Sequence, residues 1–199
     1  MDACYERVCD GVPLISKPVA EFSREYLQHY HTPEQSAHRM IDAQVLKCGT
    51  SGFITGFGGV VTLPVALPAN ITSVLYVQMR MIASTAYMGG FNPNDDEVQA
   101  LVYACLAGVS VGDMLKQSGI QFGNKLAVSL VEKIPGGILK KINENVGFRF
   151  ITKFGKTGII NIGKMVPVAG AVVSGGFDGV STRFIGDRAY KMFIDKQVL

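Results

Sequence analysis

The chain has 199 residues, 48% of them apolar and 18% charged, and its formal net charge is +3. This length suits one domain with a small appendage, and so high an apolar content argues against intrinsic disorder. The mean hydropathy is positive, which is high for a soluble protein and low for a polytopic membrane protein.

The charge is unevenly distributed along the chain. Residues 1–132 carry 8 Lys and Arg against 12 Asp and Glu, a net −4, whereas residues 133–199 carry 11 against 4, a net +7. The C-terminal third therefore either faces an anionic partner or is a basic, solvated surface.

The cysteines and histidines do not form a metal or disulfide pattern. Among Cys4, Cys9, Cys48 and Cys105 there is no C-x-x-C pair, and the opening sequence MDACYERVCDG has no hydrophobic signal core. We therefore expect a reducing, cytoplasmic location, with no disulfide framework, no metal site and no cofactor.

Two helices are predicted before the middle of the chain. Residues 18–30 place apolar side chains at helical spacing. Thr32-Pro33-Glu34-Gln35 is typical of a helix start, because Thr caps, Pro suits the first position and Gln reaches back to the cap. The second helix should end near Lys47. We predict an N-terminal helical extension over residues 1–34 and a main helical domain over residues 35–199.

An uncharged stretch of 32 residues runs from Cys48 to Met79. Pro64 and Pro68 interrupt its middle, and Gly52 and Gly56 have the G-x-x-x-G spacing that lets helices approach closely. No part offers the roughly 20 continuous apolar residues of a spanning helix. We predict a central Gly/Pro-rich hydrophobic hairpin, two helices meeting at a Pro-bounded elbow and buried against the rest of the chain. Bilayer insertion, and a switch between the two states, stay open.

The remaining segments also predict helices. A helix from about Asn70 should stop at Gly89-Gly90, and the next should start within residues 92–97 and continue through 98–107. Further helical pieces are predicted at 112–132, 134–157 and 159–174, and from about 177 to the end. No run alternates as a strand does, so the expected fold class is all-α, a compact multi-helix domain.

Ser110 lies in Gly108-Val109-Ser110-Val111-Gly112, which matches the G-x-S-x-G pattern of serine hydrolases. That chemistry needs a strand before the serine and a histidine after it, but the preceding segment predicts a helix and all three histidines come earlier in the chain. We interpret Ser110 as a residue of a helix–helix junction and keep a serine hydrolase as the less favoured alternative.

The basic stretch from Lys133 to Lys164 combines cations with an apolar row at helical spacing. This pattern is typical of a helix on an anionic bilayer surface, and equally of a helix with a core face and a wet face. Nucleic acid is not expected, because no recognised binding fold accompanies the charge. The candidate residues for an anionic surface are Lys140, Lys141, Arg149, Lys153 and Lys156.

Two blocks of the chain carry a resemblance to a known family. The first is GFITGFGGVVTLPVALPANITSVLYVQMRMIASTAYMGGF, in which a Gly-rich segment leads to Leu63-Pro64 and to a helix start at Pro68-Ala69-Asn70. The second is KMVPVAGAVVSGGFDGVSTRFIGDRAYKMF, in which Pro167 and Gly170 precede a small-residue turn and a closing helix. Over roughly residues 35–195 the chain resembles the EcsC protein family, although that family tends to carry an aspartate where this chain has Asn70.

The resemblance implies an all-helical domain, often encoded near an ABC transporter, and no particular enzymatic activity. We therefore expect a non-enzymatic protein that acts at the cytoplasmic membrane surface, peripherally, or on a membrane or transporter partner. The alternative is a soluble interaction or scaffold domain whose apolar stretches are all core. A homo-oligomer is compatible with either hypothesis.

Overall fold

The computed structural model describes residues 2–14, 16–49, 73–117, 128–131, 134–144 and 172–198. Within these residues every regular element is a helix, so the predicted all-α fold is confirmed. An isolated β bridge joins Val12 and Ser16.

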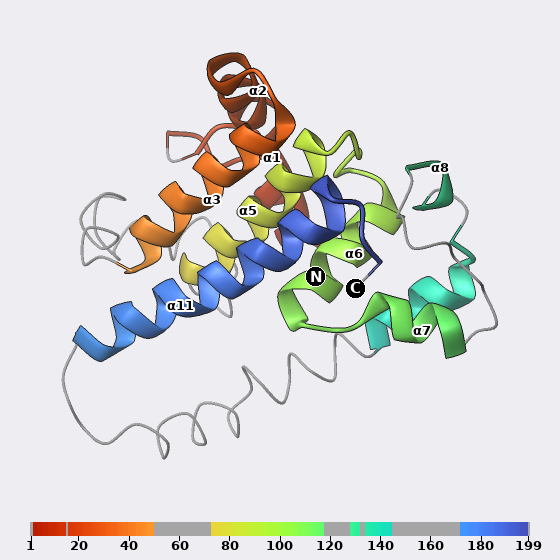
Figure 1. Cartoon of the computed structure of the whole chain (residues 1–199). Helices are drawn as coiled ribbons and strands as arrows, with labels where there is room; N and C mark the ends of the chain where they lie inside the picture. The colour runs from red at the N-terminus through yellow and green to blue at the C-terminus, as the bar shows by residue number, and fades with distance from the viewer. Residues whose placement is uncertain are drawn as a thin grey trace.

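The helices follow one another with short connections where the structure describes them (Figure 1). In chain order they are α1 (Asp2–Asp10), α2 (Val19–Tyr30), α3 (Pro33–Gly49), α5 (Ser73–Met88), α6 (Asp96–Ala107), α7 (Val111–Gln117), α8 (Val128–Val131), α11 (Val172–Ala189) and the π-helix η1 (Tyr190–Ile194). Residues 136–144 are also helical.

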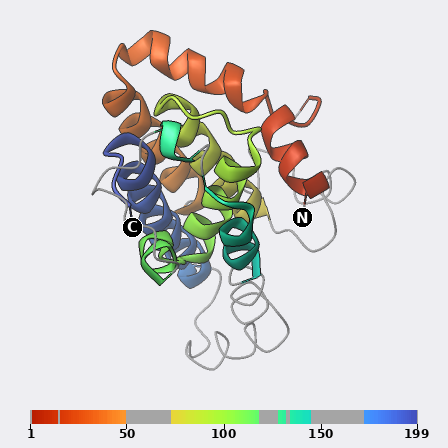
Figure 2. The same cartoon turned by 90° about the vertical axis from the view of Figure 1, so that its right-hand side faces the viewer.

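Helix α5 is the centre of the fold. It contacts α1, α2, α3, α6, α11 and η1, and every residue from 75 to 86 is buried. A helix that is buried on all sides belongs to a core. The last part of the uncharged stretch, from residue 75 to Met79, therefore lies inside the protein. Figure 2 shows α1 and α11 on opposite sides of the fold.

Helices α3 and α11 lie side by side (Figure 1). A Cβ on Gly179 of α11 would lie 3.2 Å from the Cα of Gly49, and a Cβ on Gly186 would lie 2.6 Å from Cγ2 of Ile41. Glycine at these positions lets the two backbones approach closely.

The predicted break between residues 174 and 177 is wrong. Helix α11 starts at Val172 and continues through Gly175 and Gly176, where the sequence predicts a small-residue turn. Glycine lowers helix propensity, but tertiary packing routinely overrides propensity. Further along the helix, α11 packs closely against α3 at Gly179 and Gly186.

The predicted end of α5 at Gly89-Gly90 is confirmed. Gly90 has φ of +88°, the left-handed conformation that glycine adopts without strain. Its N–H donates to the Tyr87 carbonyl and the Phe91 N–H donates to the Ala86 carbonyl, both at 3.0 Å. This pair of hydrogen bonds is the Schellman arrangement, and it satisfies carbonyls at the helix end.

Several predicted features lie outside the described residues. They include most of the hydrophobic hairpin, with Gly52, Gly56, Pro64 and Pro68, and the motif residues Pro167 and Gly170. The division between residues 34 and 35 stays a prediction; α1 and α2 both contact α5, and α2 also contacts α3.

Candidate functional site

Two of the predicted cationic residues lie in the helical segment 136–144. Lys140 and Lys141 are exposed, whereas Ile138 and Ile142 on the same segment are 6% and 0% exposed. The segment therefore has a core face and a cationic outer face, as the apolar spacing predicts. Arg149, Lys153 and Lys156 lie outside the described residues.

Ser110 lies between two helices and caps the second one. Helix α6 ends at Gly108, which has φ of +71°, and α7 begins at Val111. The Ser110 hydroxyl accepts a hydrogen bond from the Asp113 N–H at 3.2 Å, as an N-cap serine does. The helix before Ser110 differs from the strand that a nucleophile elbow needs.

Three large apolar side chains are exposed beside the α3–α11 contact. Leu46, Val180 and Phe184 are 66%, 72% and 61% exposed. The ion pair between Arg183 of α11 and Asp42 of α3, at 2.6 Å, lies beside Leu46 and Val180, since Asp42 precedes Leu46 by four residues and Arg183 follows Val180 by three. We call Leu46, Val180 and Phe184 the exposed apolar row.

A cavity of about 160 Å³ lies between α2, α3, α5 and the segment that follows α1. Exposed lysines and buried polar groups both contribute to its lining, so it reaches from the surface into the interior. Its polar lining residues are Ser16, Lys17, Gln44, Lys47, Tyr76 and Arg80.

Arg80 is the most unusual residue of this cavity, because it is charged and only 9% exposed. Its Nη1 donates to the Val8 carbonyl at 3.1 Å, and its guanidinium carbon lies 5.4 Å from the ring centroid of Phe22 and 5.9 Å from that of Tyr76. Among the described residues, no carboxylate forms an ion pair with it. The aromatic faces and one carbonyl therefore hold a buried cation in place without neutralising it.

Gln44 contributes a second unsatisfied group. Its side chain is 7% exposed, and its Nε2 has no hydrogen-bond partner in the described part of the chain. A buried donor without a partner costs roughly 1–3 kcal/mol. Gln44 thus adds a buried donor without a partner to the lining that also contains Arg80.

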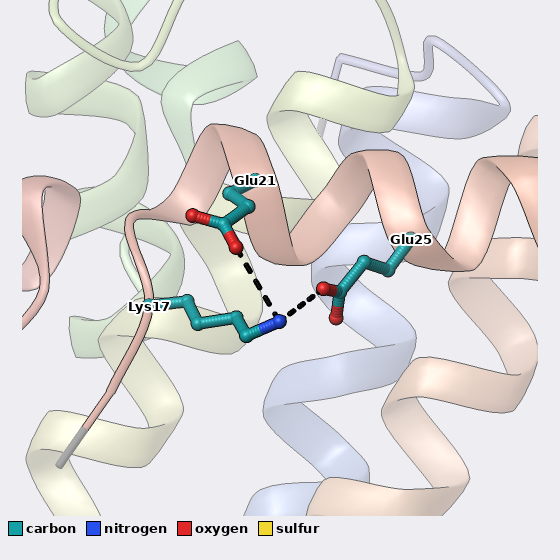
Figure 3. Close-up of polar contacts among 3 residues, drawn as sticks. All are labelled: Lys17, Glu21 and Glu25. Carbon is teal, nitrogen blue, oxygen red and sulfur yellow. Dashed lines mark hydrogen bonds and ion pairs between the residues drawn. The ribbon is translucent and has the colours of Figure 1, made fainter. Parts of the chain in front are cut away.

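Lys17 differs from Arg80, because its charge is already paired (Figure 3). Its ammonium group lies between the carboxylates of Glu21, at 3.3 Å, and Glu25. The hydrogen bond to Glu25, followed by that to Glu21, raises the pKa of Lys17. The uncompensated cations of the cavity lining are therefore Arg80 and Lys47.

Residues 28–194 match the family described as the EcsC protein family. The chain belongs to the EcsC protein family. The predicted resemblance is thus confirmed, and the matched region includes α3, α5 and α11. Gln44, Lys47 and Arg80 fall inside it, whereas Lys17 precedes it. No curated protein and no solved structure matches the chain.

The described residues of this EcsC-family protein contain no helix with the length and apolarity needed to cross a membrane. Over the same residues, His, Cys, Asp and Glu side chains do not gather in groups of three or more that could hold a metal ion.

The sequence patterns of this EcsC-family protein did not indicate Arg80 and Gln44 as site residues. In the sequence, Arg80 is the first charged residue after the uncharged stretch. One signal was available: Arg80 is the single charged residue of the α5 sequence SVLYVQMRMIASTAYM. A lone charge in an otherwise apolar, central helix indicates a polar site in the core.

Proposed function

We propose that this EcsC-family protein is a non-enzymatic peripheral protein that binds the anionic lipid surface on the cytoplasmic side of a membrane. The observation that carries the proposal is the helical segment 136–144, which exposes Lys140 and Lys141 and buries Ile138 and Ile142. The net charge of +7 over residues 133–199 adds to the attraction. Each lysine near an anionic membrane surface contributes about 1 kcal/mol to binding.

The exposed apolar row supports the same function. When exposed Leu, Val and Phe side chains enter the interfacial layer of a bilayer, their apolar surface leaves water and the free energy of the system falls. Binding would then combine two independent contributions, of which only the electrostatic one is weakened by salt.

Co-sedimentation with vesicles tests this function. We expect binding to vesicles that contain phosphatidylglycerol, weaker binding to neutral phosphatidylcholine vesicles, and a loss of the difference at high salt. Replacing both lysines, Lys140→Gln with Lys141→Gln, should weaken binding to the anionic vesicles by about tenfold or more, because about 1.4 kcal/mol corresponds to tenfold.

A charge-matched control distinguishes vesicle binding by Lys140 and Lys141 from a general effect of the protein's net charge. The double variant Arg39→Gln with Lys191→Gln removes two cations that are exposed on α3 and η1. It should retain most of the vesicle binding. Equal losses in the two double variants would contradict a role for residues 140 and 141. A monodisperse protein that binds neither vesicle type at low salt would favour the soluble scaffold instead.

A further inference from the structure

We propose that the cavity between α2, α3 and α5 is a binding site for a phosphate group. Arg80, Gln44 and Lys47 line it from two different helices, and each offers N–H donors. The ligand would be either a small phosphorylated molecule or the phosphate of a lipid headgroup, which share this chemistry.

The electrostatic argument rests on Arg80. A buried charge is costly unless an opposite charge or several hydrogen bonds compensate it. Arg80 is 9% exposed, and its hydrogen bond is to the Val8 carbonyl. The guanidinium has further N–H donors in a planar fork that suits phosphate oxygens. An anion in the cavity would provide the missing counter-charge.

The hydrogen-bonding argument rests on Gln44. Its Nε2 is buried and has no partner among the described residues, although nearly all buried polar groups in proteins have one. A ligand oxygen that accepts from this group and from Arg80 together would supply the partner that the Gln44 amide lacks. Lys47, exposed at the end of α3, adds a second positive charge at the opening.

The other polar lining groups are already engaged. The hydroxyls of Ser16 and Tyr76 are hydrogen-bonded to each other at 2.8 Å, and Lys17 is held by Glu21 and Glu25. The free donors therefore come from Arg80, Gln44 and Lys47. A tetrahedral phosphate presents oxygens in several directions and suits three donors better than a planar carboxylate does.

Binding should be measured by titration calorimetry with inorganic phosphate and with glycerol 1-phosphate, and by sedimentation with vesicles that contain phosphatidic acid. At least one of these should bind the unmodified protein, with acetate weaker than phosphate. Arg80→Lys keeps the charge but loses the fork, and Kd for phosphate should rise about tenfold or more.

Gln44→Met is a second variant, and it should raise the stability of the protein while it weakens phosphate binding. Removing the unpaired amide should raise the thermal midpoint without phosphate and weaken phosphate binding at least threefold. A residue with a merely structural role would not change the two quantities in opposite directions. Lys17→Gln is the matched control within the same lining, and it should change Kd less than threefold because the charge of Lys17 is already paired.

The binding measurements distinguish a small phosphorylated ligand from a lipid headgroup. They also distinguish this cavity site from the proposed membrane-binding surface. Binding of inorganic phosphate or glycerol 1-phosphate identifies a small-molecule site, and binding of vesicles alone that is lost in Arg80→Lys identifies a lipid headgroup. The double variant of Lys140 and Lys141 should retain phosphate binding. The cavity site can therefore be confirmed even if the proposed membrane-binding function is wrong. No binding in any arm, or binding that Arg80→Lys and Gln44→Met leave unchanged, would overturn the proposal.

Discussion

Gly89, directly after α5, lies against the backbone carbonyl of Phe193 in the π-helix η1. A Cβ on Gly89 would be 2.2 Å from the Phe193 oxygen, which is far inside van der Waals contact. The ring of Phe193 also packs edge-on to that of Phe91, with centroids 5.4 Å apart. The end of the central helix and the C-terminal helix are therefore fitted to each other at a position where only glycine has room.

Gly89→Ala should destabilise the protein by about 1–3 kcal/mol, because the added methyl meets backbone rather than a movable side chain. Urea denaturation measures the loss. The control is Gly137→Ala, since a Cβ at Gly137 meets nothing within 4 Å and the residue is helical. That change should stabilise by up to about 1 kcal/mol. A neutral Gly89→Ala would show that η1 moves freely away from α5.

Ser110→Ala should destabilise the protein by about 0.5–2 kcal/mol, because the N–H of Asp113 loses its cap at the start of α7. Ser110→Asp should recover most of the stability, since aspartate caps well and its charge suits the helix N-terminus. Unfolding in urea checks both variants. We also expect a fluorophosphonate probe to leave Ser110 unlabelled, and a labelled Ser110 would revive the hydrolase alternative.

The Cys105 thiol should make the protein less stable as the pH rises above about 9. Burial raises the pKa of Cys105 to about 12, although the nearby Arg188 guanidinium partly opposes the rise. In the unfolded chain the thiol has its ordinary pKa of about 8.5. Between these two values the unfolded chain releases a proton that the folded protein retains, so unfolding becomes more favourable with pH.

The Cys105→Ala variant isolates this effect. From pH 8 to pH 10 the unmodified protein should lose about 2 kcal/mol more of its unfolding free energy than the variant does, by the linkage of one thiol proton. Other groups with raised pKa values, such as Cys9, are present in both proteins and cancel. Equal losses in the two proteins would contradict the burial of this thiol in the native state.

Gln78 should act together with Thr182 to join α5 to α11. The Gln78 Nε2 donates to the Thr182 hydroxyl at 3.0 Å and to the Ser181 hydroxyl at 3.3 Å, and Gln78 and Thr182 are both buried. Gln78→Met should cost about 1–3 kcal/mol, because it leaves the buried hydroxyl without this donor. In a double-mutant cycle with Thr182→Val, the coupling should exceed about 0.5 kcal/mol. Additive losses would argue against a direct interaction.

Local sequence patterns predict the ends of the helices best where the capping residues lie next to those ends in the chain. The start of α3 at Pro33 follows from Thr32, whose hydroxyl accepts from the Gln35 N–H at 3.3 Å. The end of α5 follows from Gly90. The continuity of α11 through Gly175 and Gly176 did not follow from the local pattern, because two adjacent glycines favour a turn, whereas the helix continues through them and packs against α3.

The sequence alone determined the all-α fold class, the family and the helix–helix junction at Ser110, since helical spacing and helix ends depend on residues within a few positions of one another. Only the tertiary structure decided the candidate ligand site. Gln44, Lys47 and Arg80 come from α3 and α5, which are joined by a segment outside the described residues, and their chemistry depends on burial and shared space. Burial is a property of the packed helices, and for that reason the same Arg80 that ends an uncharged stretch in the sequence lines a cavity in the fold.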